Sequence, residues 1–130
     1  MHERLNPSTM VPPLGAYSHG IAVEKGLRWV FVSGQLGIAP DGTLASGAEA
    51  QADVAWENIG RVLEAGGMTT ADLIKTTTYV VDRDLIPAVR AARQRHMPGP
   101  DFPASTFVIV AGLVRPEFLV EIEAVAARAA

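Results

Sequence analysis

Residues 102–126 read FPASTFVIVAGLVRPEFLVEIEAVA, and this stretch decides the fold that we expect. Two runs rich in β-forming residues flank a short break with glycine and proline, a pattern that predicts a β-hairpin. Glu121 and Glu123 are two residues apart, so both side chains would point to one face of the second strand. A carboxylate on an apolar strand is costly unless it meets water, a cation or a partner. The stretch therefore predicts a polar site on one face of the hairpin and a buried core on the other.

Size and composition favour one domain that associates with copies of itself. The chain has 130 residues, which fits a single domain over residues 1–130. Hydrophobic residues make up 48% and charged residues 19%, so there is material for a core and a weakly polar surface. Such a surface favours burial against identical subunits.

Charge and cysteine content exclude several classes of function. A net charge of −3 argues against a nucleic-acid-binding surface, which needs a clustered excess of Lys and Arg. Without cysteine there are no disulfides, no thiolate catalysis and no cysteine zinc site. We see neither a membrane span nor the apolar core of a signal peptide, and we therefore expect a soluble cytoplasmic protein.

The remaining chain predicts three more strands and two helices. Prolines at positions 7, 12 and 13 make residues 1–13 an extended, irregular arm. Helical periodicity places Trp56 in the core rather than in a ligand site. The expected elements are strands over 21–24, 27–35 and 73–81 and helices over 48–65 and 85–97. With the hairpin, the order is ββαβαββ, an α+β fold with both helices on one sheet face.

The strand expected over residues 27–35 is apolar at successive positions. Trp29, Val30, Phe31 and Val32 follow one another without a polar residue between them. Such a run predicts a strand that is buried on both faces.

Several segments, in order and at family spacing, resemble the RidA (YjgF) family from about residue 14 to residue 126. The matching segments are Gly15–Ser18, Val32–Gln35, Asn58–Gly66, Ile74–Thr77, Phe102–Ala104 and Val120–Ala124. The resemblance implies a chorismate-mutase-like, ferredoxin-like ββαβαββ fold that assembles as a homotrimer. In such an assembly three sheets form a central barrel, helices lie outside it, and small-molecule clefts lie between subunits.

The best-known activity of that family is hydrolysis of reactive imines and enamines, such as 2-aminoacrylate, to a keto acid and ammonia. The resemblance implies that Glu121 positions the attacking water and that Tyr17 lines the cleft. It also implies that Ser33 and Gly34 supply backbone contacts. The residues alone leave a second possibility for Tyr17, in which the ring only packs and its hydroxyl bonds to backbone. We expect no cofactor.

One departure from the family pattern changes the expected ligand. Active members read Pro-Ala-Arg-Ser or Pro-Ala-Arg-Thr here, and the arginine clamps the substrate carboxylate, whereas this chain has Ser105 followed by Thr106. A hydroxyl offers one donor and no charge, whereas a guanidinium offers a planar charged fork. Loss of two charge-assisted bonds would weaken carboxylate binding by roughly 10² or more. The resemblance therefore points to an arginine-lacking branch.

Three functions are consistent with these observations. The first is an imine deaminase or related hydrolase with a changed substrate, in which Glu121 positions water and Ser105 and Thr106 bind the ligand. The second is a trimeric binding protein that has lost the chemistry, as Ser105 suggests. The third is an endoribonuclease, a label that is also given to the family, which the acidic balance disfavours.

Other polar residues have simpler interpretations. Arg115 would replace the missing cation only from a new position, and a loop arginine is usually solvated. His2, His19 and His96 are isolated and do not have the spacing of a metal site. Glu123 would face either solvent or a cation of another subunit.

Overall fold

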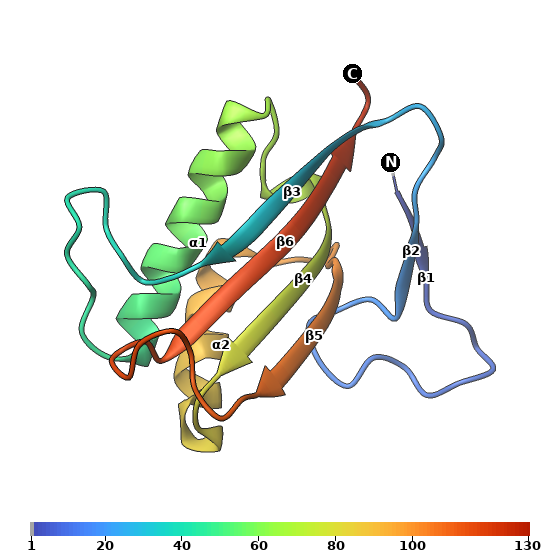
Figure 1. Cartoon of the computed structure of the whole chain (residues 1–130). Coiled ribbons are helices and arrows are strands. Elements are labelled where there is room, and N and C mark those ends of the chain that lie inside the picture. The colour runs from blue at the N-terminus through green and yellow to red at the C-terminus, as the bar shows by residue number, and fades with distance from the viewer. Residues whose placement is uncertain (1) are drawn as a thin grey trace.

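The computed structural model describes residues 2–130, and it shows an α+β fold (Figure 1). The strands are β1 (Glu3–Leu5), β2 (Gly20–Ala22), β3 (Arg28–Gln35), β4 (Leu73–Val80), β5 (Ala104–Ile109) and β6 (Val120–Arg128). The helices are α1 (Ala48–Ala65) and α2 (Ile86–His96), with short 3₁₀ turns at Thr70–Asp72 and Arg83–Leu85. The expected class and both long helices are confirmed, and the ends of α2 differ from the prediction by one residue each.

The four-stranded sheet has the order β3-β6-β4-β5. The predicted hairpin is therefore wrong, because β4 lies between β5 and β6 and pairs with both. β4 runs parallel to β5 and antiparallel to β6, and Tyr79 faces Val108 on one side and Glu121 on the other. Proximity in sequence suggested a hairpin, but residues 110–119 are long enough to carry the chain past the end of β4.

The amino-terminal region differs from the prediction in two ways. β2 does not join the main sheet but pairs antiparallel with β1, so residues 1–13 are not wholly irregular (Figure 1). The prolines at 7, 12 and 13 lie in the connection between β1 and β2, where they interrupt no ladder. His2 Nε2 lies 2.7 Å from the Ala127 carbonyl oxygen, and Arg4 Nε donates to the Phe102 carbonyl at 3.3 Å. Met1 lies outside the described residues.

Both helices cover one face of the sheet, where the core lies (Figure 1). Along α1 the fully buried positions recur at helical spacing and include Ala52, Trp56, Ile59 and Leu63. Trp56 is 1% exposed and stacks on His96 of α2, so its predicted place in the core is confirmed. None of the helices within residues 2–130 is long and apolar enough to cross a membrane.

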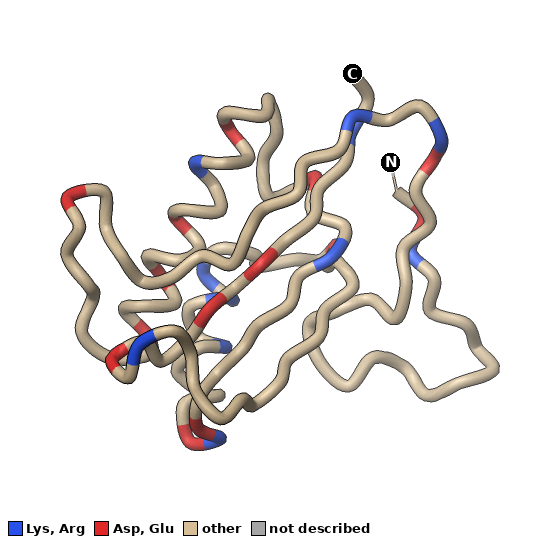
Figure 2. The backbone as a smooth tube through the Cα atoms, in the orientation of Figure 1, with Lys and Arg blue, Asp and Glu red and all other residues tan. Residues whose placement is uncertain are grey.

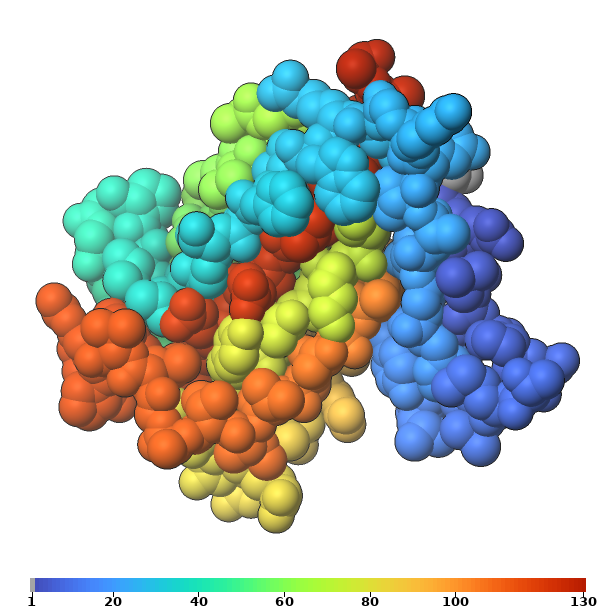
Figure 3. Space-filling model, turned by 45° about the vertical axis from the view of Figure 1, so that its right-hand side comes forward, coloured from blue at the N-terminus to red at the C-terminus, as the bar shows by residue number. Residues whose placement is uncertain are grey.

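The opposite face of the sheet carries no helix (Figure 3). On β3, Val32 is buried toward the helices, but Trp29 and Phe31 are 44% and 72% exposed and stack on each other. The prediction that this strand is buried on both faces is therefore wrong for the single chain, because the side chains alternate between a covered and an open face. Figure 3 shows this open face running from β3 across β6 and β4 to β5.

Candidate functional site

A hollow on the open face gathers the two glutamates of β6. The hollow has a volume of about 550 Å³, and Gly34, Tyr79, Glu121 and Glu123 line it. Its other side is the connection from β5 to β6, residues 110–114. As predicted, Glu121 and Glu123 both face a polar environment from β6. Figure 2 shows acidic positions along this strand, which lies inside the sheet.

The two glutamates have different partners. The hydroxyl of Tyr79 on β4 donates a short hydrogen bond to a carboxylate oxygen of Glu123. That bond raises the pKa of the Tyr79 phenol above its ordinary value, and the charges of Glu123 and Glu121 act in the same direction. In residues 2–130, the Glu121 carboxylate has no hydrogen bond or ion pair from any side chain or backbone group. Glu121 is thus free to bind a water or a ligand.

Gly34 allows Glu121 to lie close to the backbone of β3. A β-carbon at position 34 would lie 2.7 Å from Cδ of Glu121, which is closer than real contacts allow. The pairing of β3 with β6 is irregular between Val32 and Gln35, and this irregularity brings the glycine next to the carboxylate. The absence of a side chain at position 34 is therefore what gives the carboxylate its place.

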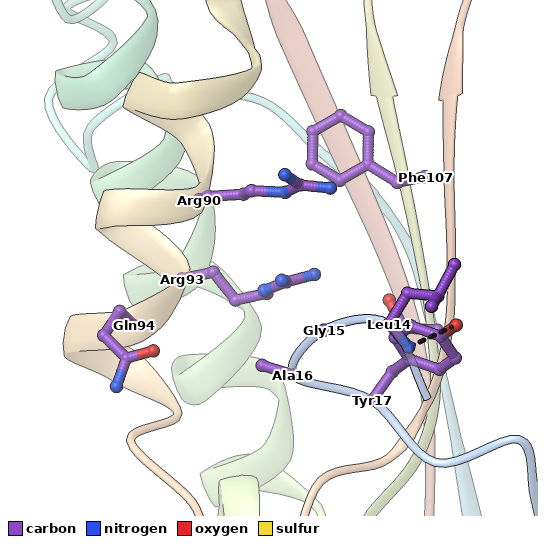
Figure 4. Close-up of a pocket in the computed structure, with 9 residues that line it drawn as sticks. Leu14, Gly15, Ala16, Tyr17, Arg90, Arg93, Gln94 and Phe107 are labelled. Carbon is purple, nitrogen blue, oxygen red and sulfur yellow. Dashed lines mark hydrogen bonds between the residues drawn. The ribbon is translucent and has the colours of Figure 1, made fainter. Parts of the chain in front are cut away.

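A second cavity lies at the edge of the sheet formed by β5, on the face that the helices cover (Figure 4). It has a volume of about 530 Å³ and lies between α2, β5 and the loop of residues 14–17. Phe107 lines one wall, and the polar lining comes from Tyr17, Arg90, Arg93, Gln94 and Ser105.

Hydrogen bonds fix Ser105 and the loop opposite the helix. The Ser105 hydroxyl accepts a hydrogen bond from the Thr76 hydroxyl at 3.2 Å, and Thr76 is fully buried. The Ser18 amide donates to the Pro103 carbonyl at 2.9 Å, and the Ser18 hydroxyl donates to the Phe102 carbonyl at 2.6 Å. The loop is thereby attached to the start of β5, which places Tyr17 and Ser105 in one cavity.

Tyr17 combines the two interpretations that the sequence left open. Its ring lines the cavity, and its hydroxyl accepts a hydrogen bond from the Leu14 amide at 3.1 Å (Figure 4). The ring also packs edge-to-face on His19, whose Nε2 lies 2.7 Å from the Val11 carbonyl oxygen. His19 supports the loop and is not part of the cavity lining.

Arg90 and Arg93 were not predicted as site residues. Both side chains extend from α2 toward β5 and the loop (Figure 4). Residues three apart in a helix share a face, so two arginines at this spacing on the predicted helix were a usable signal. No local pattern indicates that this face of the helix shares a cavity with Ser105, because the cavity is formed by segments that are distant in the chain.

The six predicted site residues fall into separate places in the single chain. Tyr17 and Ser105 line the cavity beneath the sheet, on the face that the helices cover. Gly34 and Glu121 line the hollow on the open face. Ser105 pairs with Thr76 and Glu121 pairs with Tyr79, which is about 10 Å farther along β4. One chain therefore does not bring Ser105 and Glu121 together.

Thr106 and Ser33 line neither cavity. Thr106 lies on the opposite face of β5 from Ser105, and its hydroxyl accepts a hydrogen bond from Lys75 Nζ at 2.6 Å. Ser33 is exposed next to Gly34, and its carbonyl accepts from the Gln35 side-chain amide at 3.0 Å.

Other polar residues that the sequence singled out have local partners. Arg115 is exposed, lies over the Phe118 ring and is 4.0 Å from Glu117. His96 Nε2 lies 3.1 Å from Asp53 Oδ1, and His96 lines neither of these two cavities. Among residues 2–130, no group of three or more His, Asp or Glu side chains is arranged to hold a metal ion.

Comparison with known proteins places the chain in a family. The sequence profile of the family described as Endoribonuclease L-PSP matches residues 8–128, nearly the whole chain. The chain belongs to this family. Its members include the RidA and YjgF proteins, so the resemblance seen in the sequence is confirmed.

Two relatives resemble this chain over most of their own length. A RutC family protein of Haemophilus influenzae is 39% identical over 111 residues, which cover 82% of this chain and 84% of the relative. A protein of Salmonella typhimurium named 2-iminobutanoate/2-iminopropanoate deaminase is 33% identical over 118 residues, 88% of this chain and 89% of the relative.

Solved structures of the family share the fold. YyfB from Yersinia pestis, a protein of unknown function in the conserved Rid family, superposes with a TM-score of 0.87 at 32% identity and covers 98% of each chain. RidA from an Antarctic Psychrobacter has a TM-score of 0.71 at 31% identity, with 87% of this chain and 89% of that chain covered.

Proposed function

We propose that the protein hydrolyses small imines, and enamines once they have tautomerised to imines, and that it works as a homotrimer. Glu121 is the observation that carries this proposal, because its carboxylate lies without a partner in a hollow that Gly34 keeps open. A carboxylate in this setting can hold a water and accept its proton. Relatives named as iminobutanoate and iminopropanoate deaminases supply the reaction class.

A trimer would bring together the two separate parts of the site, which are the hollow with Glu121 and the cavity with Tyr17 and Ser105. Trp29 and Phe31 leave an aromatic patch on the open face, and patches of this kind mark interfaces. If the open face of one subunit packs against the edge of the next, Glu121 of one copy meets the cavity with Tyr17 and Ser105 of its neighbour. The substrate then lies in an intersubunit cleft, and no cofactor takes part.

The chemistry follows from this arrangement. Glu121 accepts a proton from water while the water oxygen bonds to the imine carbon and the C=N electron pair moves to nitrogen. That proton passes to the nitrogen, which gives the carbinolamine. The hydroxyl proton of the carbinolamine then moves, by way of Glu121, to the amino nitrogen, the C–N bond breaks, and ammonia leaves as the carbonyl forms. One water is consumed for each ammonia released, and the contribution of the protein is to position the water and the imine carbon.

The test measures ammonia and keto acid release from 2-iminobutanoate that an amino acid oxidase generates in the assay. Glu121→Gln keeps the size of the side chain but cannot accept the proton, and we expect its rate to fall by about 10² or more. Glu64→Gln changes an exposed glutamate on α1 and serves as the matched control. Equal rates for wild type and Glu121→Gln would rule out the proposed role of Glu121.

A non-catalytic, ligand-binding trimer is the second candidate, and Ser105 in place of the family arginine favours it. In that case the wild type binds small ligands but does not accelerate ammonia release. Gain of imine hydrolysis on Ser105→Arg, with none in the wild type, would support binding over catalysis.

Endoribonuclease activity, which the family name carries, is the least favoured candidate. The two glutamates in the hollow of the open face would repel a phosphate backbone, and the net charge is −3. The test incubates the pure protein with RNA in the absence of any imine. Rapid cleavage by wild type that Glu121→Gln abolishes would overturn our preference.

A further inference from the structure

The cavity beneath the sheet contains two arginines without acidic partners. Arg90 and Arg93 lie on one face of α2, and both side chains extend into the space opposite β5 (Figure 4). No Asp or Glu lines this cavity, and within the described chain neither guanidinium takes part in an ion pair or a hydrogen bond. By contrast, Arg95 on another side of the same helix binds both Glu49 and Asp53.

Arg90 and Arg93 differ in what holds them. The Arg90 guanidinium lies over the Phe107 ring, 5.9 Å from its centroid, a cation–π contact that fixes the group against β5. Arg93 has no such contact and is half-buried. Burial and the neighbouring charge of Arg90 lower the pKa of the Arg93 guanidinium, so this place in the protein disfavours a second positive charge. An anion bound in the cavity would offset that cost.

Ser105 lies in the same cavity and retains a donor. Its oxygen accepts the hydrogen bond from Thr76, which leaves its own hydroxyl hydrogen available for a ligand. The cavity therefore offers one free hydroxyl donor from β5 and a charged fork from α2. A carboxylate fits this set, because its two oxygens accept a bidentate guanidinium and a further donor.

We propose that Arg93 binds the carboxylate of the substrate, with Ser105 as an additional donor and Arg90 as a neighbouring positive charge. The cation that the strand lacks at position 105 is thus supplied by the helix. The choice of an α-keto or α-imino acid as ligand rests on the proposed function, but the binding itself does not require turnover. Arg115, by comparison, lies outside this cavity and is not needed for the charge.

Calorimetric titration of the assembled protein with 2-oxobutanoate tests the proposal without any catalytic step. Arg93→Gln should bind this keto acid about 10- to 100-fold more weakly than wild type, since it loses a charge-assisted bidentate contact. Arg93→Lys should lie between the two, because it keeps the charge and loses the fork. Arg83→Gln, in the 3₁₀ turn before α2, is the matched control and should bind as wild type does.

Two further ligands and one double variant define the site. The neutral 2-oxobutanamide should bind wild type more weakly than the acid and should not distinguish wild type from Arg93→Gln. Inorganic phosphate tests for a general anion site. Ser105→Arg combined with Arg93→Gln should restore binding of 2-oxobutanoate, because it returns a cation to the strand side of the same cavity.

Equal affinity of wild type and Arg93→Gln for 2-oxobutanoate would overturn the proposal. So would equal binding of acid and amide, or binding of phosphate without binding of the keto acid. Circular dichroism and thermal melting establish that each variant is folded, and Arg93→Lys serves if Arg93→Gln is not. Arg93-dependent binding without ammonia release would refute the proposed function alone, and imine hydrolysis that is indifferent to Arg93→Gln would refute this inference alone.

Discussion

The carboxylate of Glu121 on β6 lies against the backbone of Gly34 on β3, in space that a side chain at position 34 would occupy. A β-carbon at position 34 would overlap the carboxylate and lie 2.7 Å from Cδ. Because the end of a glutamate side chain is flexible, the fold can survive a methyl group at this position, but the carboxylate must move. The contact thus links a backbone feature of β3 to the position of the proposed water-binding group.

Gly34→Ala should therefore impair imine hydrolysis more than stability. We expect the rate of ammonia release to fall by about 10-fold or more, because misplacing a positioned group is costly. Gly60→Ala is the matched control: a β-carbon there meets nothing within 4 Å, and alanine in a helix is more stable than glycine by about 0.5–1 kcal/mol. Steady-state kinetics and thermal melting of both variants give the answer. An unchanged rate for Gly34→Ala would show that this contact does not set the geometry of the reaction.

Tyr79 should titrate above the ordinary value for tyrosine. The hydrogen bond to Glu123, with the nearby charge of Glu121, raises the pKa of its phenol, so the protonated form persists to higher pH. The chain has two tyrosines, so the Tyr17→Phe variant isolates the absorbance of Tyr79 during an alkaline titration. Glu123→Ala in that background should move the midpoint back toward 10. A midpoint that does not respond to Glu123→Ala would contradict the hydrogen bond as the cause.

Local patterns were sufficient for the helices and insufficient for the strand order. The apolar stripe around Trp56 and the glycine at position 66 define α1, because both signals act within a few turns of one helix. The position of β4 between β5 and β6 depends on pairing between distant segments. The break with glycine and proline between the two runs indicates a change of direction but carries no information on which strands pair.

The candidate site shows the same division. Glu121 could be predicted because two carboxylates on an apolar strand need a polar environment, and the hollow supplies it. Arg93 could not be placed, since nothing within α2 indicates that its arginines face Ser105 across a cavity. What joins these residues is tertiary packing, and for Ser105 and Glu121 it is, in our proposal, packing between subunits.

Asp53 should make stability depend on pH in the acid range. Burial alone would raise the pKa of this carboxyl, but hydrogen bonds and charges from Arg95 and His96 outweigh it and lower the pKa. A lowered pKa in the folded state stabilises the protein above the unfolded value near 3.9, and that contribution is lost as the pH falls through the folded value. Asp53→Asn should therefore unfold more easily than wild type at pH 7, by about 1 kcal/mol, because these groups are partly exposed.

Urea denaturation at pH 7 and at pH 2.5 measures this difference. The gap in unfolding free energy between wild type and Asp53→Asn should shrink at the lower pH, because the wild-type carboxyl is then increasingly protonated. Glu57→Gln, which changes a carboxylate 3.8 Å from Arg61 on the exposed side of α1, should have a smaller effect at either pH. A gap of constant size would mean that the link between α1 and α2 does not depend on the charge of Asp53.

Phe31→Glu should dissociate the proposed trimer. Phe31 is 72% exposed and stacks on Trp29 at a centroid distance of 6.1 Å, on the face that we assign to subunit contacts. A charge buried in an apolar interface is strongly unfavourable, whereas the same charge on a monomer surface is harmless. Sedimentation or light scattering should give three chain masses for wild type and one for the variant. Ammonia release should be lost with the assembly because, in our proposal, each cleft combines Glu121 of one copy with the cavity at Tyr17 and Ser105 of another. Val11→Glu, an equally drastic change at a 64% exposed position in the amino-terminal connection, should remain trimeric and active. A wild type of one chain mass that still hydrolyses imines would refute the shared cleft, since in a single chain Glu121 and Ser105 lie on opposite faces of the sheet.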